Sequence, residues 1–294
     1  MRTAMTGMLI SVLLAACGAG TVPSTSGVPT VRPTDAAPSP TETASTPEPT
    51  PELTPEPSGP HFTLVGLGDS VAGGLKCNDP CRSYVLTFGE LASAALGQPV
   101  VTHNLATNDG LTSDKLLARI RTDATTRTAI AEADIVTVQI GSNDWQGPCT
   151  FEGHVSCLAN GLKRVEPNLD AILVEIQSLR AGKPTAIRVV TSYNGYAGNS
   201  RTSAIWGFVA RPADIELFER DFSQALRDFN AMTCRVAGAH DAVCVDIGPV
   251  FNGPALDQPA AAGLINSDGA HALEAGQLLI AQTLDAAGYT PLEP

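Results

Sequence analysis

Two short polar segments of this chain carry residue types that together perform nucleophilic catalysis. Ser70 ends the segment Gly68-Asp-Ser, and His271 stands three residues after Asp268, near the end of the chain. A serine hydroxyl becomes a strong nucleophile when a histidine takes its proton, and a carboxylate beside that histidine holds the imidazole in the required tautomer. The sequence therefore predicts Ser70 as nucleophile, His271 as base and Asp268 as orienting acid.

Two further segments supply candidate donors for the negative charge that develops on an attacked carbonyl oxygen. They are Asn104-Leu-Ala-Thr-Asn-Asp-Gly110 and Gly141-Ser-Asn143-Asp. The backbone N–H groups of Ser70 and Gly110 and the side-chain amide of Asn143 are the three predicted donors. Losing one such donor typically lowers the rate by about 10² to 10³. Taken singly, Gly110 is also a common turn residue and Asn143 a common Asx-turn residue.

His271 is the strongest candidate base among the five histidines of the chain. It alone has a carboxylate three residues before it, and His103, at the end of an apolar run, is its best competitor. We expect a helix to begin at His271, so that Asp268 and His271 share a face one turn apart. In the simpler alternative, Asp268 only caps that helix. Both roles are compatible.

Apolar runs and amphipathic stretches alternate along the chain, and they predict where these side chains lie. The runs that predict strands are 62–67, 99–104, 134–140, 186–192 and 242–247. The stretches that predict helices are 83–96, 111–121, 161–181, 213–236 and 271–287. This alternation indicates an α/β domain with a mainly parallel sheet covered by helices on both faces. Ligands bind beyond the carboxyl ends of such strands, where the catalytic segments fall.

One long segment after the fourth predicted strand is rich in glycine and aromatic residues. It runs from Tyr193-Asn194-Gly-Tyr196 to Trp206-Gly-Phe. Aromatic rings stack on sugars and also line acyl grooves, so the segment does not choose between these substrates. We predict that Tyr193, Asn194, Tyr196 and Trp206 contact the substrate.

The four segments, in this order, resemble those of the SGNH hydrolases, also called the GDSL esterase/lipase family, over residues 62–288. The resemblance implies a flavodoxin-like three-layer sandwich with a five-stranded sheet and no metal or other cofactor. Val71 stands where the family frequently has Leu, and Ala272 where many members have Pro. The Asn104 segment carries one extra residue, which leaves Asp109 as an alternative to Gly110 for the backbone donor.

An ordinary α/β-hydrolase is disfavoured, because its nucleophile elbow reads Gly-x-Ser-x-Gly. The resemblance instead implies a serine esterase that hydrolyses carboxylic esters through an acyl-enzyme. One alternative substrate class is the O-acetyl group of a cell-wall or environmental glycan. A different class of function is an inactive surface-binding lipoprotein that kept the fold.

The N-terminal residues predict export and anchoring to a membrane. Residues 1–16 read as a signal peptide that ends in Leu14-Ala-Ala-Cys17, which resembles a lipobox, so Cys17 is the predicted lipidated residue. An ordinary secretory peptide is the alternative. Residues 17–60 form a predicted Pro/Thr/Ser/Glu-rich linker, with 11 of the chain's 22 prolines in its last 41 residues. Residues 61–294 are the predicted hydrolase domain, extracytoplasmic and monomeric.

Charge and cysteine content agree with this compartment. The net charge is −12 and no basic cluster exists, so nucleic acid is not an expected partner. Six cysteines remain besides Cys17. Sequence alone allows 15 pairings of them, and pairing of neighbours is the simplest hypothesis. Zinc is disfavoured, because no second pair or histidine accompanies Cys-x-x-x-Cys. The expected disulfide cysteines are Cys77, Cys81, Cys149, Cys157, Cys234 and Cys244.

Overall fold

A computed structural model describes residues 59–78, 81–145, 154–198 and 212–292. Its centre is a sheet of parallel strands in the order β2-β1-β3-β4-β5. Val65 of β1 is paired on one side with His103 of β2 and on the other with Val136 of β3. The strands are β1 (Phe62–Gly68), β2 (Val100–Asn104), β3 (Ile135–Gln139), β4 (Ala186–Val190) and β5 (Val243–Val245).

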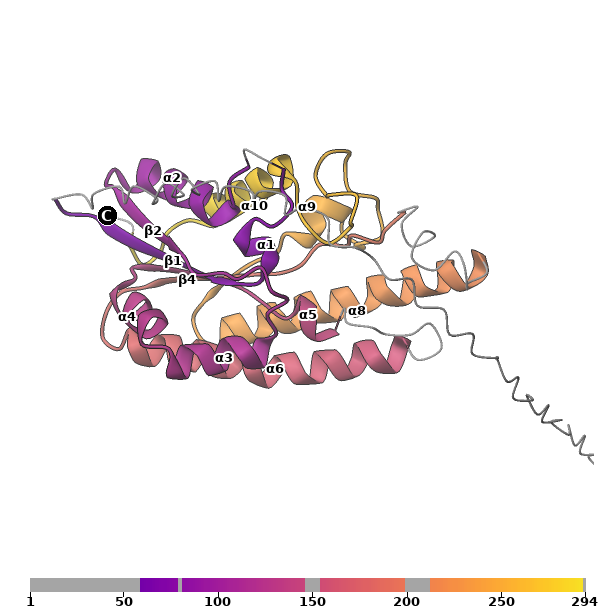
Figure 1. Cartoon of the computed structure of the whole chain (residues 1–294), viewed down its shortest axis with the longest axis horizontal. Coiled ribbons are helices and arrows are strands. Elements are labelled where there is room, and N and C mark those ends of the chain that lie inside the picture. Colours follow the sequence, from indigo (N-terminus) through magenta and orange to yellow (C-terminus); the bar gives the residue numbers. More distant parts are fainter. Residues whose placement is uncertain (1–58, 79–80, 146–153, 199–211, 293–294) are drawn as a thin grey trace, which may run out of the picture. The chain divides into compact units, whose positions relative to one another are not determined.

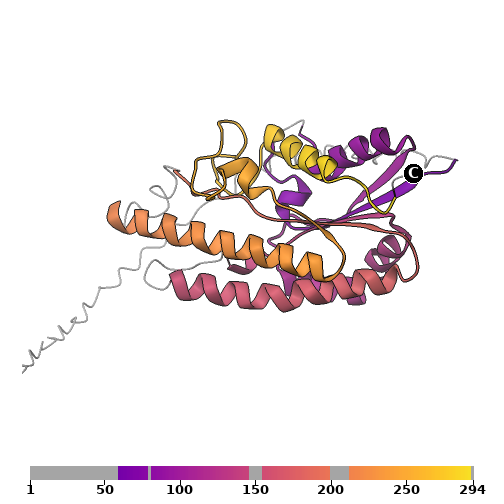
Figure 2. The same ribbon diagram turned by 180° about the vertical axis from the view of Figure 1, so that it is seen from behind.

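Helices cover both faces of this sheet, so the domain has three layers (Figures 1 and 2). One face is covered by α2 and α10, and the other by α3, α4, α6 and α8. The helices are α1 (Ser70–Gly73), α2 (Tyr84–Leu96), α3 (Ser113–Thr122), α4 (Ala124–Glu132), α5 (Ser142–Trp145), α6 (His154–Leu179), α8 (Pro212–Ala239), α9 (Gly248–Asn252) and α10 (Glu274–Ala286).

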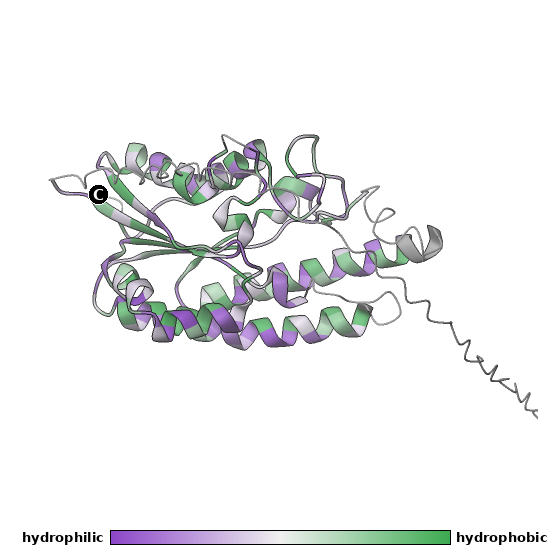
Figure 3. Ribbon diagram, viewed as in Figure 1, coloured by the Kyte–Doolittle hydropathy of each residue, from purple (hydrophilic) through white to green (hydrophobic). Residues whose placement is uncertain are grey.

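Two hydrophobic cores hold the layers together, one on each face of the sheet. Every residue of β3 is buried, as expected for a central parallel strand. Alternate residues of a strand point to opposite faces, so Ile135 joins the core under α2 and α10 while Val136 joins the core under α3, α6 and α8. In Figure 3 the strands of the sheet are mostly coloured as hydrophobic. Each fully buried aliphatic side chain stabilises the fold by about 1.5–3 kcal/mol.

The predicted fold class is confirmed, and the strand bounds differ from the prediction by at most two residues at either end. The strand order is that of the flavodoxin-like sheet, with β1 and β3 at the point where the order reverses. Four helices were not predicted. Three of them, α1, α5 and α9, have only four or five residues, too few to show a helical period.

Two predicted helix starts are wrong. The last helix begins at Glu274, with Leu273 as its N-cap, so His271 lies in the loop before it. The reason is an antiparallel bridge between Ile265 and Ala272, which holds the chain extended just after His271. Helix α6 begins at His154, seven residues before the predicted start.

Two of the predicted neighbouring disulfides are present, Cys77–Cys81 and Cys234–Cys244. Cys157 is also disulfide-bonded, whereas Cys149 lies outside the described residues. The predicted signal peptide, Cys17 and the linker up to residue 58 also lie outside them. Among the helices of the described ranges, none is both long and apolar enough to cross a bilayer.

A matched pair of glycine substitutions tests the packing of α10. A Cβ on Gly276 would lie 2.2 Å from the backbone oxygen of Leu264, whereas a Cβ on Gly238 in α8 would meet no atom within 4 Å. We expect Gly276→Ala to lower the free energy of unfolding by about 2 kcal/mol. Gly238→Ala should raise it by about 0.5 kcal/mol, since alanine loses less backbone entropy on folding. Urea denaturation with the disulfides intact measures both, and equal effects would contradict this packing.

Candidate active site

The candidate nucleophile stands where β1 ends and α1 begins. Ser70 is the first residue of α1, and Asp69 caps the helix by accepting a hydrogen bond from the Val71 N–H at 3.1 Å. The turn before it is tight: a Cβ on Gly68, whose φ is +158°, would lie 2.4 Å from the Gln139 backbone oxygen at the end of β3. Glycine at position 68 therefore lets β1 deliver Ser70 to the carboxyl edge of the sheet beside β3.

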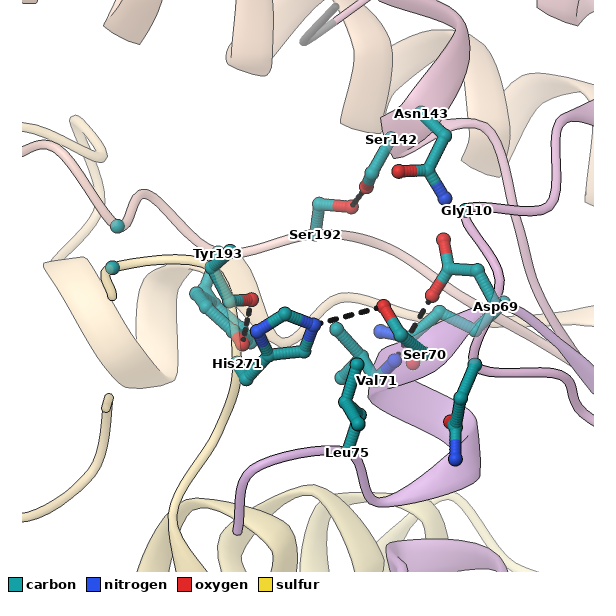
Figure 4. A pocket seen from close by; sticks show the side chains of 15 residues that line it. Asp69, Ser70, Val71, Leu75, Gly110, Ser142, Asn143, Ser192, Tyr193 and His271 are labelled. Atoms are coloured by element: carbon teal, nitrogen blue, oxygen red, sulfur yellow. Dashed lines mark hydrogen bonds between the residues drawn. The ribbon is translucent and has the colours of Figure 1, made fainter. Parts of the chain in front are cut away.

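A continuous chain of hydrogen bonds joins the three residues predicted for catalysis. Nε2 of His271 lies 3.0 Å from Oγ of Ser70, and Nδ1 of His271 lies 2.5 Å from Oδ2 of Asp268 (Figure 4 draws the first bond). Because the carboxylate accepts from Nδ1–H, Nε2 is left free to accept the serine proton. The imidazole and the carboxylate are largely buried, at 13% and 17% side-chain exposure.

Asp268 is held by a turn and not by the helix face that the sequence predicted. Its Oδ1 accepts the backbone N–H groups of Ala270 and His271 at 2.9 and 3.0 Å, while its Oδ2 meets the imidazole. Burial alone would raise the pKa of Asp268. The N–H groups of Ala270 and His271, the imidazole and the Lys76 ammonium outweigh this effect and hold the pKa well below its usual range. Asp268 therefore stays charged at neutral pH.

The loop after β4 supports the loop that carries Asp268 and His271. The Tyr193 hydroxyl donates to the Ala270 backbone oxygen at 2.8 Å, and the Tyr193 ring stacks on Phe251 with centroids 4.5 Å apart. A Cβ on Gly195 would lie 1.6 Å from the Gly269 backbone oxygen, so glycine there permits direct contact between the two backbones. Tyr193 and Gly195 thus fix the height of His271 above the sheet edge.

The predicted oxyanion donors lie across the same pocket from His271 (Figure 4). As the first residue of α1, Ser70 has an N–H group without an intrahelical acceptor. The Asn143 amide donates one hydrogen to the Leu111 backbone oxygen at 2.9 Å, which fixes its orientation and leaves its second hydrogen. Gly110, with φ of +74°, lines the pocket, whereas the Asp109 side chain accepts the Thr107 hydroxyl nearby.

Asp144, next to Asn143, anchors this wall of the pocket. Its carboxylate accepts both the N–H and the hydroxyl of Ser113 at the start of α3, at 2.8 and 2.7 Å. Burial raises the pKa of Asp144, and the two bonds from Ser113 lower it in part. These bonds tie α3 to α5, so the turns that carry Gly110 and Asn143 keep their relative position.

These residues surround a pocket of about 230 Å³. Five of the predicted residues line it: Ser70, Gly110, Asn143, Tyr193 and His271. Several other lining residues have no predicted role, because residues of these types are common in and around such segments and carry no signal of their own. These unpredicted lining residues include Asp69, Val71, Leu75, Asn108, Gln139, Ser142 and Ser192. The hydroxyls of Ser142 and Ser192 lie 2.9 Å apart and close the wall opposite Ser70.

Asp69 differs from Asp268 in its charge state. It is only 2% exposed, and burial raises its pKa to about 7, against the lowering effect of the Val71 N–H, while Asp144 adds a smaller upward shift. Burial and the nearby Asp69 in turn raise the pKa of Tyr84 and Tyr193 well above the usual range. The pocket therefore has a neutral carboxyl on one side of Ser70 below about pH 7, and a charged one on the other.

The predicted substrate-binding residues do not all line the pocket. Tyr193 lines the pocket. Asn194 is 2% exposed and its amide donates to Ser223 and Leu256, so it shapes the loop and does not line the catalytic pocket. Tyr196 packs edge-on against Phe222 at 4.6 Å and is likewise absent from that lining. Trp206 lies outside the described residues. In the part of the chain that the structure covers, no cluster of three His, Cys, Asp or Glu side chains is placed to hold a metal ion.

The sheet order and its helical layers define a doubly wound α/β protein of the flavodoxin-like type. The chain belongs to the GDSL-like lipase/acylhydrolase family, whose model matches residues 67–278. It is therefore an ester-hydrolysing enzyme, and the alternative of an inactive binding protein is set aside. None of the curated proteins matches this chain.

Solved structures of similar fold include three esterases or lipases. Lip_vut3, a lipase from a goat rumen metagenome, has 18% identity and a TM-score of 0.64, over 79% of this chain and 100% of that chain. A catalytic mutant of Axe2, an acetylxylan esterase from Geobacillus stearothermophilus, has 19% identity and a TM-score of 0.53, over 79% and 96%. A lipase/acylhydrolase from Enterococcus faecalis has 19% identity and a TM-score of 0.51, over 79% and 98%.

The charge state of Asp69 predicts a pH dependence of stability. Its pKa is about 7 in the folded protein against 3.8 for the ordinary group, so between these values the unfolded chain is ionised while the folded chain keeps the proton. The free energy of unfolding therefore falls as pH rises through this window, by at most about 4 kcal/mol from this group. Asp69→Asn removes that contribution.

Urea denaturation of wild type and Asp69→Asn at pH 4 to 8 measures the contribution of Asp69 to the free energy of unfolding. Ionisable groups that do not interact with Asp69 cancel in the difference between wild type and Asp69→Asn. We expect the stability of wild type relative to the variant to decline from about pH 4 to about pH 7 and then level off. A difference that does not change with pH would contradict a protonated Asp69.

Proposed function

We propose that this enzyme is a serine esterase that hydrolyses carboxylic esters through an acyl-enzyme, with Ser70, His271 and Asp268 as its catalytic triad. The observation that carries the proposal is the hydrogen-bond chain from Asp268 Oδ2 through both nitrogens of His271 to Ser70 Oγ, at 2.5 and 3.0 Å. It supplies a nucleophile, a base and an orienting carboxylate in contact with one pocket.

In the first half of the reaction, Ser70 Oγ attacks the ester carbonyl carbon while His271 Nε2 takes the hydroxyl proton. The charge on the carbonyl oxygen is stabilised by the N–H groups of Ser70 and Gly110 and by the Asn143 amide. Asp268, which stays ionised, balances the positive imidazolium. His271 then gives its proton to the departing alkoxide, so an alcohol leaves and the acyl group remains on Ser70.

In the second half, water takes the place of the alcohol. His271 removes a proton from the water, whose oxygen attacks the acyl carbon, and the same three donors hold the second oxyanion. Collapse of this intermediate returns the proton to Ser70 Oγ and releases the carboxylic acid. Nε2 of His271 carries each of these protons, while Nδ1–H stays bonded to Asp268.

The size of the pocket favours a short acyl group. At about 230 Å³, the pocket formed by the described residues is smaller than the 300–1,000 Å³ typical of sites for drug-sized ligands, and the apolar side chains that line it include Val71 and Leu75. The small pocket supports an ester substrate whose acyl group is about the size of acetyl. The O-acetyl group of a glycan is therefore the second candidate substrate, and the fold shared with an acetylxylan esterase is compatible with it.

Three features of the sequence support a location outside the cytoplasm for the proposed reaction. Leu14-Ala-Ala-Cys17 supports lipidation at Cys17, and the proline-rich segment that follows supports an extended tether between a membrane and the catalytic domain. Six further cysteines agree with an oxidising compartment. The proposed working form is a membrane-anchored monomer that acts on a small-molecule or glycan ester.

Removal of either end of the proton path tests the triad. We expect Ser70→Ala and His271→Ala each to lower kcat for a p-nitrophenyl ester by at least about 10⁴-fold, because nucleophile and base act as a unit. Ser178→Ala, on the exposed surface of α6, is the matched control and should retain full activity. Thermal melting of all three variants checks that folding is intact. Turnover at the wild-type rate in either catalytic variant would overturn the assignment.

An ester series from acetyl to palmitoyl tests the size of the acyl site. We expect kcat/KM to be highest for acetyl and to fall by about tenfold or more at octanoyl, because a longer chain would meet few apolar side chains among the described lining residues. Ser70→Ala provides the blank at each length. A maximum at octanoyl or longer would contradict the short acyl site, while selective release of acetate from an acetylated glycan would favour the second candidate.

A further inference from the structure

A lysine outside the four sequence segments contacts the catalytic acid. Nζ of Lys76 lies 3.1 Å from Oδ2 of Asp268, the oxygen that also meets Nδ1 of His271. The Lys76 side chain is 55% exposed, whereas that of Asp268 is 17% exposed. The solvent-accessible ammonium of Lys76 thus contacts the largely buried carboxylate of the proposed triad.

The backbone around Lys76 is held in place from three directions. The Leu75 N–H donates to the Ser70 backbone oxygen at 2.9 Å, which keeps the chain close to the nucleophile. The Asn266 amide donates to the Lys76 backbone oxygen at 2.9 Å, which ties it to the loop that carries Asp268. The next residue, Cys77, is bonded to Cys81. We name residues 74–78 the lysine loop.

Lys76 also adopts a constrained backbone conformation. Its φ is +56°, in the left-handed region that a residue with a side chain seldom occupies. Asn78, two residues on, also has a positive φ of +70°. Such a conformation persists only where surrounding contacts determine it, and here the Asn266 bond and the disulfide supply those contacts. The lysine loop is thus built to hold its side chain at Asp268.

We infer that Lys76 is a positioning residue for the proposed triad: its ammonium fixes Asp268 and weakens the attraction of that carboxylate for the imidazolium of His271. The inference rests on the proposed function. A carboxylate that shares one oxygen between an imidazole and an ammonium exerts less negative potential on the ring. Without the ammonium, Asp268 should stabilise the positive imidazolium more strongly, so the rise of activity with pH should move to higher pH.

Other ionisable groups lie near Lys76, Asp268 and His271. They are the same in wild type and in the Lys76 variants described below. The Tyr193 hydroxyl stays neutral, since burial raises its pKa far above the range of the assay. Asp69 lies on the far side of Ser70 and titrates near pH 7 whether or not Lys76 is present. Lys76 and His271 contact the same carboxylate oxygen, and Lys76 is partly in solvent. Removal of Lys76 should therefore move the midpoint of the activity profile by about half a pH unit.

The test compares kcat/KM against pH for wild type, Lys76→Met, Lys76→Gln and Lys76→Arg, with p-nitrophenyl acetate as the substrate. We expect the acid-side midpoint to rise by about half a pH unit in the Met and Gln variants, with a several-fold lower plateau. Lys76→Arg should restore both values, because it keeps the charge. In about 1 M NaCl the difference between wild type and Lys76→Met should shrink, since salt screens a partly exposed pair.

Lys183→Met is the matched control. Lys183 precedes β4 at the amino edge of the sheet, opposite the active site, and its Nζ contacts the Ala131 backbone oxygen. This variant removes the same charge and should leave the midpoint where wild type has it. A Lys76→Met midpoint equal to that of Lys183→Met, or shifted downward, would overturn the inference while wild-type activity still requires Ser70. Activity that survives Ser70→Ala would overturn the proposed function instead.

Discussion

The pairing of β1 with both β2 and β3 is the constraint on which the rest of the structure depends. Because the strand order reverses at β1 and β3, the connections that leave these two strands turn to opposite faces of the sheet and leave a gap at the carboxyl edge. Ser70 leaves β1 on one side of that gap, and Asn143 follows β3 on the other. Strand order therefore brings the proposed nucleophile and a proposed oxyanion donor to the same gap.

The two carboxyl groups on either side of Ser70, those of Asp69 and Asp268, differ in charge. Asp69 is buried and keeps its proton up to about pH 7, while Asp268 is held ionised by N–H groups and two basic side chains. A negative charge at Asp69 would lie beside the proposed oxyanion donors and oppose the charge that they would stabilise, whereas a negative charge at Asp268 would support the proposed imidazolium. Burial and hydrogen bonding together assign the two carboxyl groups to different roles.

Sequence reasoning succeeded where the signal was local or periodic. Val/Ile runs gave all five strands, and the Asp-x-x-His spacing gave a pair that is in contact. It failed where contacts between distant segments determine the geometry. The bridge at Ala272 delays α10, so the contact between Asp268 and His271 comes from a turn. Lys76 reaches Asp268 across a separation of 192 residues, and no spacing in the sequence marks that approach.

The contact between Gly195 and Gly269 has a consequence for changing substrate choice by directed evolution. The segment after β4 is an obvious target for a library, since Tyr193 lines the pocket and the chain beyond it is rich in glycine and aromatic residues. Any side chain at Gly195 would push the Gly269 backbone away and carry His271 with it. A library that fixes both Tyr193 and Gly195 and varies later positions of the segment therefore keeps the support of His271 while it samples new specificities.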